Sequence, residues 1–356
     1  MKLVWMIGWL SGLCNLLSAQ TPDSILLANY RPTSIYQIPQ TKVSKARFPV
    51  IDMHSHAYPS SADALEQWVQ TMDQFNIEKT IILTYATGPL FDSLYQVYSK
   101  YENRFDIWCG IDFTGYEKPN WNKQAIKELI RCFKIGAKGV GELGDKGKGL
   151  LYSRPIPAPG MHLDDSRLRL VLAKCGELNM PVNIHVAEPM WMYQKQDSTN
   201  DGLMNGFKWK VDLSDSATLN HSQLIQSLEN AVKQNPNTTF IACHFANCSY
   251  DLSILGNLFD KYPNLYADIS ARFGETAPIP RYMQSFYIKY ADRLLFGTDM
   301  GDQPEMYEVV FRILETEDEH FYQQDFFNYH WPLHGFGLND NTLKKLYYEN
   351  AQKILD

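Results

Sequence analysis

Short apolar runs alternate with amphipathic segments along the chain from residue 48 onward. The first run, Phe48-Pro-Val-Ile-Asp-Met-His-Ser-His56, predicts a buried strand that ends in two histidines. Seven further runs have the continuous apolar character of strands buried on both faces, as in parallel sheets: residues 80–84, 105–111, 137–142, 181–185, 239–244, 265–269 and 293–299. Segments with the helical spacing of apolar residues separate these runs: 62–75, 93–101, 123–134, 168–178, 221–234, 252–261 and 282–290.

This regular alternation predicts an α/β fold with parallel strands and right-handed crossovers. Eight such units over this length favour a (β/α)8 TIM barrel that spans residues 48–356. The alternative is an open doubly wound sheet that binds a nucleotide, but no G-x-G-x-x-G follows the first strand and the sequence has no P-loop. We expect an irregular N-terminal arm at 21–47 and long loops at 143–164 and 187–219 after strands four and five. The C-terminal extension at 307–356 is expected to be mostly helical, with a loop at 331–337 inside it.

Residues that bind metals stand at the ends of five of these strands. His54 and His56 are two positions apart on a strand, so their side chains project to the same face. The other strands contribute, in chain order, Glu142, His185, His244 and Asp299. In a barrel these strand ends share the C-terminal rim, where active sites are built. A single strand-end histidine is more often structural, but removing all six groups from water without a cation would be costly, so the sequence predicts a metal site.

Five segments of the chain resemble the amidohydrolase superfamily of metal-dependent barrels. They are Val50-Ile-Asp-Met-His-Ser-His56, Gly139-Val-Gly-Glu142, Pro181-Val-Asn-Ile-His185, Phe240-Ile-Ala-Cys-His244 and Leu295-Phe-Gly-Thr-Asp299, in the order in which the family carries them. The resemblance is greatest to the amidohydrolase-related branch, which includes aminocarboxymuconate-semialdehyde decarboxylase-like enzymes. These motifs are specific for the superfamily and poorly specific for the reaction.

The resemblance implies a role for each candidate ligand. The first metal ion would be bound by His54, His56 and Asp299, and a second by His185 and His244. Alternatively, His185 joins the first ion and His244 contacts the substrate or the catalytic water. Glu142 stands where many relatives have a carboxylated lysine, and it would either bridge two ions or orient a histidine from behind. The expected cofactor is one or two divalent ions, with zinc favoured and manganese as the alternative.

The chemistry implied by this ligand set is metal-assisted hydrolysis. A zinc-type ion lowers the pKa of a bound water and generates hydroxide at a substrate carbonyl. Asp299 would take the proton from that water and pass it to the leaving group, while His244 or His185 helps to polarise the carbonyl. The sequence thus favours a hydrolase that cleaves an amide, ester or lactone bond in a small molecule. The runner-up is a non-oxidative decarboxylase of an aromatic or muconate-like acid, a reaction of the same branch, and the third hypothesis is a binding barrel that has lost catalysis.

Three residues outside the ligand set are candidates for substrate contact. Arg272 follows strand seven and could clamp a carboxylate with two hydrogen bonds, although a salt bridge that holds its loop is an equal alternative. Tyr58 lies two residues after His56 and could line the pocket. Trp191 lies in the loop after strand five, where it could form part of a lid or pack within that loop.

The charge balance argues against several classes of partner. The 356 residues carry a formal net charge of -7, and no block of Lys and Arg occurs, which disfavours nucleic acid and anionic membranes. The expected partner is a small-molecule substrate, and a homo-oligomer is left open.

The first twenty residues differ from the rest of the chain. Lys2 precedes an apolar run from Leu3 to Leu17, and small and polar residues follow up to Gln20. This order is typical of a secretory signal peptide, so we expect residues 1–20 to be removed and the mature protein to be exported, to the periplasm or beyond. Export permits disulfides, but the cysteines after residue 20 are odd in number and lack the spacing of a disulfide framework. We therefore expect buried free thiols.

Overall fold

The structure, a computed structural model, describes residues 21–59, 61–101 and 103–356. The predicted signal peptide, residues 1–20, lies outside the described residues, and its removal stays a prediction. Within the described part of the chain, all eight predicted strands are present. Their bounds are β1 Val50–Ser55, β2 Ile77–Leu83, β3 Phe105–Trp108, β4 Val140–Asp145, β7 Val182–Val186, β8 Phe240–Ala242, β9 Leu265–Asp268 and β10 Leu294–Leu295.

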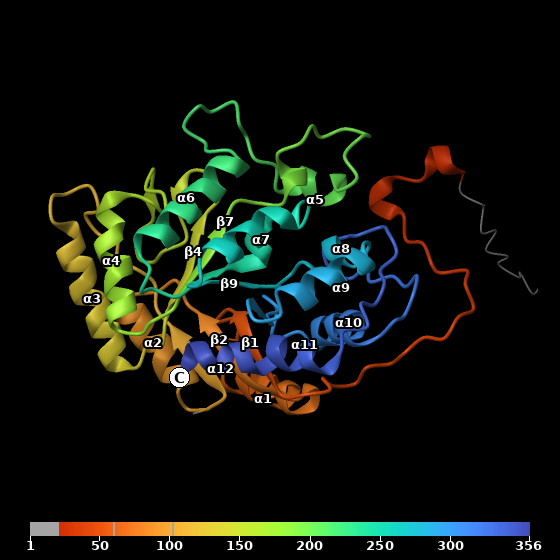
Figure 1. Ribbon diagram of the computed structural model, residues 1–356, viewed down its shortest axis with the longest axis horizontal. Helices are drawn as coiled ribbons and strands as arrows, with labels where there is room; N and C mark the ends of the chain where they lie inside the picture. Colours follow the sequence, from red (N-terminus) through yellow and green to blue (C-terminus); the bar gives the residue numbers. More distant parts are fainter. Residues whose placement is uncertain (1–20, 60, 102) are drawn as a thin grey trace, which may run out of the picture.

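The eight strands follow one another in chain order through the centre of the molecule (Figure 1). Parallel ladders join β1, β2 and β3 in one sheet, and β4, β7, β8, β9 and β10 in another. The two sheets meet at both edges. Cys109, just after β3, pairs with Val140 of β4, and the Met53 amide of β1 donates a 2.9 Å hydrogen bond to the carbonyl of Phe296, just after β10. The predicted (β/α)8 TIM barrel is therefore confirmed.

Some strand ends differ from the prediction in ways that shape the site. β4 continues to Asp145, so Glu142 lies within the strand. β8 stops at Ala242, and His244 belongs to the helical turn η4, Cys243–Asn247. The strand β10 has only two residues because the Phe296 amide donates instead to the Leu346 carbonyl of the C-terminal segment, at 2.9 Å.

Amphipathic helices fill the connections and surround the strands (Figure 1). Their bounds are α1 Ala62–Phe75, α2 Gly88–Tyr98, α3 Trp121–Ile135, α4 Ser166–Glu177, α6 His221–Gln234, α7 Leu252–Lys261, α9 Pro280–Lys289 and α10 Pro304–Glu315. In α6, for example, Leu224, Leu228 and Val232 recur every four residues and are buried, since that spacing places them on one face.

The loops and the tail contain short elements that the sequence pattern did not predict. The loop after β4 has antiparallel bridges between β5, Gly149–Leu150, and β6, Ala158–Pro159. The loop after β7 holds the turn η3, Met190–Met192, and the helix α5, Leu203–Lys208, and α8, Phe273–Thr276, follows β9. The N-terminal arm has turns at Pro22–Ser24 and Leu27–Asn29. The tail is less helical than expected, because residues 316–339 separate α10 from α11, Asp340–Lys344.

The C-terminal end of the chain packs against the floor of the barrel. A π-helical turn, Lys345–Glu349 (η5), leads into α12, Asn350–Leu355, which lies beside β1 and β2 in Figure 1. Ala351 of α12 belongs to the same buried cluster as the side chains that fill the barrel interior: Ile51, Met53, Ile81, Leu83, Trp108, Ile241 and Leu295. The tail thus completes the core opposite the rim that carries the candidate ligands.

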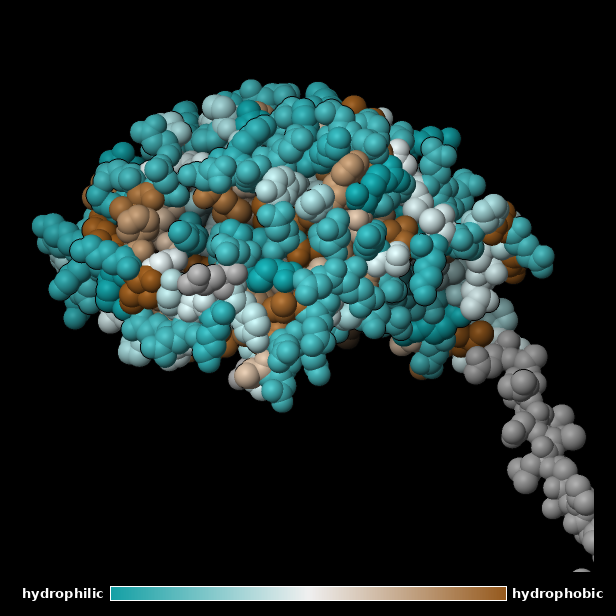
Figure 2. Space-filling model, turned by 90° about the horizontal axis from the view of Figure 1, so that it is seen from below, coloured by the Kyte–Doolittle hydropathy of each residue, from teal (hydrophilic) through white to brown (hydrophobic). Residues whose placement is uncertain are grey.

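Polar side chains cover most of the face shown in Figure 2, and apolar ones lie between them in small groups. Among the described residues, no helix is long and apolar enough to cross a membrane. The cysteines in this part of the chain, Cys109, Cys132, Cys175, Cys243 and Cys248, are buried free thiols, as expected.

Asn350 gives a direct test of how strongly α12 holds the barrel floor. Its buried side-chain amide donates to the carbonyls of Ala291 at 2.6 Å and Leu294 at 2.9 Å. Because Asn350→Ala leaves these buried acceptors without that donor, it should lower the free energy of unfolding by about 2 kcal/mol. Urea denaturation measures the change. The exposed neighbour Gln352 is the control, since Gln352→Ala should stay within about 0.5 kcal/mol of wild type. Equal stability of the two variants would contradict this role.

Candidate metal centre

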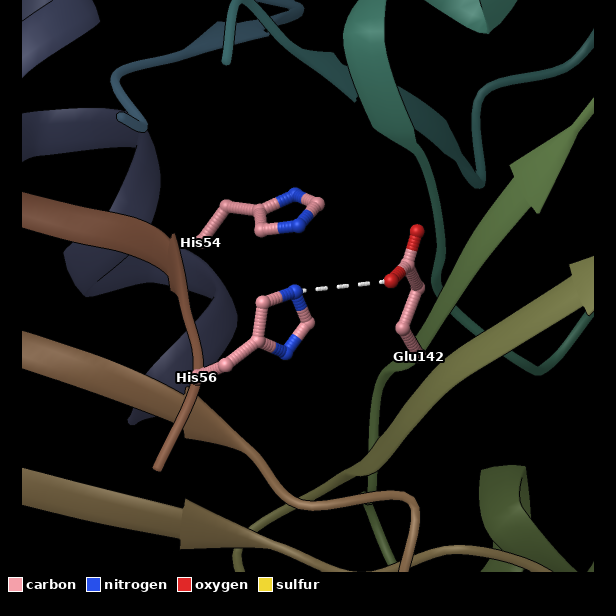
Figure 3. A group of neighbouring side chains, drawn as sticks. All are labelled: His54, His56 and Glu142. Carbon is pink, nitrogen blue, oxygen red and sulfur yellow. Dashed lines mark ion pairs between the residues drawn. The ribbon is translucent and has the colours of Figure 1, made fainter. Parts of the chain in front are cut away.

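The barrel brings the six predicted ligands together at its C-terminal rim. Their nitrogen and oxygen atoms fall into three overlapping groups, in each of which the atoms lie within 4.8 Å of one another: His54, His56 and Glu142; His54, His244 and Asp299; and Glu142, His185 and His244. Figure 3 shows the first group, with His54 of β1 and His56, the residue after β1, facing Glu142 of β4. The strand order places all three groups side by side because β1 and β10 meet at one edge and β4, β7 and β8 are neighbours.

His54 lies at the deepest point of the cluster and is fully buried. Its Nδ1 is 3.0 Å from Oδ2 of Asp268, and its Nε2 is 3.5 Å from Oδ1 of Asp299. Burial disfavours a charged ring, but the negative charges of Asp268 and Asp299 outweigh it and raise the pKa of His54 to about 10. The Nε2 atom is buried and has no hydrogen-bond partner.

His56 and His244 are oriented by backbone carbonyls. Nδ1 of His56 donates to the Leu83 carbonyl at 2.9 Å, and Nδ1 of His244 donates to the Ser270 carbonyl at 2.7 Å. A histidine that donates from Nδ1 offers a lone pair at Nε2, the arrangement that orients metal-binding imidazoles. Burial and the neighbouring positive charge of Arg272 hold the pKa of His244 well below its usual value, so this ring is neutral.

Glu142 occupies the centre of the cluster. Its Oε1 is 2.7 Å from Nδ1 of His185 and 3.9 Å from Nε2 of His244, while its Oε2 is 3.6 Å from Nε2 of His56. Burial alone would raise the pKa of Glu142, but the surrounding histidines lower it well below its usual value. One buried carboxylate therefore presents its two oxygens to two different sets of imidazoles.

The donor set fits a divalent metal. Neutral imidazole nitrogens and carboxylate oxygens are the ligands used by zinc and, with more oxygens, by manganese. The unpaired Nε2 of fully buried His54 is an atom that would gain a partner from such an ion. His54, His56, Glu142, His185, His244 and Asp299 are the residues that would hold it.

Two residues that the sequence analysis did not assign belong to this cluster. Asp268, at the end of β9, accepts a hydrogen bond from the His244 amide at 2.9 Å as well as from His54, and so fixes two candidate ligands at once. Tyr85, two residues after β2, places its hydroxyl 2.9 Å from Oε2 of Glu142. Both are polar residues at the end of a predicted strand, which is the same signal that identified the candidate ligands, so the sequence could have indicated them as well.

A cavity of about 190 Å³ opens beside His185, His244 and Asp299. Arg272 and Trp191, two of the predicted substrate contacts, line it. The third, Tyr58, is not among the lining residues; its hydroxyl donates to the backbone carbonyl of Asp299 and lies 3.3 Å from Oδ1 of the same residue. The other walls come mainly from the loops and the tail: Lys146, Glu188, Pro189, Met192, Asn205, Trp209, Ala271, Glu275, Phe327 and Tyr329.

The two cations of this cavity are each paired with a carboxylate. Nε of Arg272 is 3.3 Å from Oε1 of Glu275 and donates to Oδ1 of Asn247 at 3.0 Å, so the predicted salt bridge within the loop is present. Nζ of Lys146 contacts Oε1 of Glu188. Although burial opposes it, His185 and Lys146 hold the pKa of Glu188 at about 2. Both cations line the cavity.

Comparison with known sequences places the chain in a family. The family profile described as Amidohydrolase matches residues 118–356. The chain belongs to the amidohydrolase family. The matched region contains Glu142, His185, His244 and Asp299. His54 and His56 precede it, and the fold brings them to the same centre.

Solved structures show that this member of the amidohydrolase family shares its fold with other TIM-barrel proteins. A putative amidohydrolase from Staphylococcus aureus has 15% identity and a TM-score of 0.55, over 86% of this chain and 99% of that chain. An uncharacterised TIM-barrel protein from Bordetella bronchiseptica has 16% identity and a TM-score of 0.54, over 86% and 98%. A dihydroxybenzoic acid decarboxylase from Polaromonas, solved with manganese and 2-nitroresorcinol, has 14% identity and a TM-score of 0.54, over 86% and 97%. No curated protein matches this chain.

An ion pair between Asp145 and His162 holds the loop that carries Lys146, and its strength depends on pH. The Asp145 carboxylate accepts hydrogen bonds from the amides of Gly147 and Gly149, and its Oδ2 is 2.8 Å from Nδ1 of His162. The hydrogen bond to Asp145 outweighs burial and raises the pKa of His162. A raised histidine pKa stabilises the folded state at pH below the unfolded value of about 6.5, and this contribution is lost as the pH rises through the folded pKa.

The free energy of unfolding of wild type should therefore be higher than that of His162→Ala. This difference should be largest at acidic pH and should become smaller as the pH rises. Urea denaturation of both proteins across that range measures it. His330 is a control of opposite sign, because burial lowers its pKa, so the stabilisation that His330→Ala removes should grow as the pH rises. A gap for His162→Ala that widens with pH would contradict the assignment.

Proposed function

We propose that this member of the amidohydrolase family is an exported metal-dependent hydrolase that cleaves an amide, ester or lactone bond in a small molecule. The observation that carries the reaction type is the position of Glu142, whose Oε1 faces His185 and His244 while Oε2 faces His56. A carboxylate in that position can bridge two ions, an arrangement suited to hydrolysis. The proposal of export rests on the order of charged, apolar and small residues in positions 1–20.

A divalent metal held by this cluster, zinc in the first instance, would supply a Lewis acid for the substrate carbonyl and acidify a water molecule. The proton-transfer role falls to Asp299, which lines the cavity. Burial opposes its ionisation, but His54 and His56 outweigh burial and lower the pKa of Asp299, so its carboxyl group is ionised at neutral pH, the form that a general base requires. Tyr58 holds the Asp299 backbone through its carbonyl and so limits the movement of this base.

The runner-up function is the non-oxidative decarboxylation of an aromatic or muconate-like acid. It is favoured by Arg272 and Lys146, two cations in the cavity that could hold a carboxylate, and by the aromatic side chains Trp191, Trp209 and Tyr329 beside them. An acidic substrate would suit a hydrolase equally well. Incubating the purified protein with ester, lactone, amide and hydroxybenzoate panels and assaying both bond hydrolysis and CO2 release separates the two reactions.

Metal content tests the bridging role of Glu142. The purified protein should hold about two divalent ions per chain, since a carboxylate that faces two imidazole sets serves both. Glu142→Gln should lower this stoichiometry toward one, because the amide is a poorer bridge. Elemental analysis of both proteins without added chelator measures it. Wild-type stoichiometry in the variant would instead assign Glu142 to orienting His185.

Asp299→Asn tests the general base. The substitution preserves shape and removes the proton acceptor, so kcat should fall about 100-fold or more while the dissociation constant of the substrate changes little. Steady-state kinetics on the best substrate from the panels, together with a metal analysis of the variant, measures both quantities. Unchanged kcat in a variant that retains its metal would remove the assignment.

A further inference from the structure

The hydroxyl of Tyr85 lies within hydrogen-bond distance of two candidate ligands, Glu142 and His56. Its Oη is 2.9 Å from Oε2 of Glu142 and 3.0 Å from Nε2 of His56. Its ring stacks on the imidazole of His56, with centroids 4.8 Å apart and an interplanar angle of 15°. The hydroxyl therefore lies between the side chains of His56 and Glu142, both of which Figure 3 draws.

The backbone of Tyr85 is held in a conformation that bulky residues rarely adopt. Its φ is 59°, in the left-handed region that is uncommon for aromatic residues. The amide donates to the Gly141 carbonyl at 3.1 Å, and the Tyr85 carbonyl accepts from the Arg154 amide at 2.9 Å. A Cβ at Gly110 would stand 2.1 Å from that carbonyl oxygen, so a glycine is required beside it. Strain that neighbouring segments enforce in this way is concentrated at functional sites.

The hydrogen atoms around this hydroxyl are too few for the lone pairs that converge on it. His56 donates from Nδ1 to Leu83, so its Nε2 is an acceptor. The Glu142 carboxylate is an acceptor, and Oδ1 of Asp299, 3.1 Å from Nε2 of His56, is another. Tyr85 brings a single hydrogen, which can satisfy only one of them. A cation among these atoms would satisfy His56 and leave the Tyr85 hydrogen for Oε2 of Glu142.

We propose that Tyr85 is a positioning residue of the metal centre: its hydroxyl holds Oε2 of Glu142 toward His56 while His185 holds Oε1. The two hydrogen bonds fix both ends of one carboxylate, and the carboxylate then spans the two sets of imidazoles. Groups that hydrogen-bond a metal-binding carboxylate in this way tune the affinity for the metal. This inference rests on the metal centre of the proposed function and is independent of which bond the enzyme cleaves.

Tyr85→Phe tests the inference, because it keeps the ring that stacks on His56 and removes only the hydroxyl. Competition between the full-length protein and a chromophoric chelator for zinc should show affinity about 10- to 100-fold lower than wild type. The matched control is Tyr152→Phe, since the Tyr152 ring is 5.9 Å from that of Tyr85 and its hydroxyl does not bond to the ligand cluster. The control should bind zinc as wild type does, and both variants should retain the wild-type near-ultraviolet circular dichroism.

A double variant decides whether Tyr85 acts through Glu142. If it does, Tyr85→Phe should weaken zinc binding little further when Glu142→Gln is already present, because the coupling of two groups in one network is non-additive. Additive losses would overturn the inference, as would wild-type affinity in Tyr85→Phe, an equal loss in Tyr152→Phe, or a wild-type protein that binds no zinc. Zinc affinity is measured without substrate, so a failed search for hydrolysis would overturn the proposed reaction and leave the role of Tyr85 standing.

Discussion

The buried carboxylate of Glu142 is the group on which the geometry of the rim depends. It lies inside β4, almost without contact with solvent, and its negative charge is tolerated there because His185, His56 and Tyr85 converge on its two oxygens. Charge pairing also holds the residues around Glu142. Asp268 balances His54 and fixes the start of the η4 turn through the His244 amide. Each charged side chain of the cluster is held by contacts with another, so these contacts make the cluster rigid as a unit.

The barrel made much of this predictable from the sequence. In a (β/α)8 fold the carboxyl ends of all strands lie at one rim. A polar residue at the end of an apolar run, such as His185 at the end of residues 181–185, can therefore be placed at that rim without knowledge of the loops. The tail was harder. Its helical spacing predicted helices, but nothing in that spacing says that Ala351 packs into the barrel interior or that residues 316–339 cross to the rim.

Other parts of the site depend on backbone conformations that a hydrophobic pattern does not encode. Tyr85 reaches Glu142 because its φ is positive, and His244 faces the centre from a turn whose residues also have positive φ. Lys146 lines the cavity because β4 continues three residues past Glu142, further than the apolar run indicated. The strand pattern locates the candidate ligands, whereas turns and strand ends decide which other residues lie beside them.

Ligands and cavity walls come from different parts of the chain. The candidate ligands stand on or just after the barrel strands, whereas Trp191, Trp209 and Tyr329 come from the loop after β7 and from the tail segment between α10 and α11. Most of the cavity walls and the candidate ligands therefore lie on separate segments, and loops can change without disturbing the strands.

The floor of the barrel has a consequence for how the chain reaches its native state. Because α12 supplies part of the interior packing, the first strand, β1, meets its last neighbours only after residues 345–355 have been synthesised. Until then the nascent chain must keep soluble the apolar side chains that β1, β2, β3, β8 and β10 contribute to this cluster, so chaperones that bind extended segments have a long window in which to act. A fusion partner joined after Asp356 would sit directly beneath the barrel, where it competes with the docking of that helix.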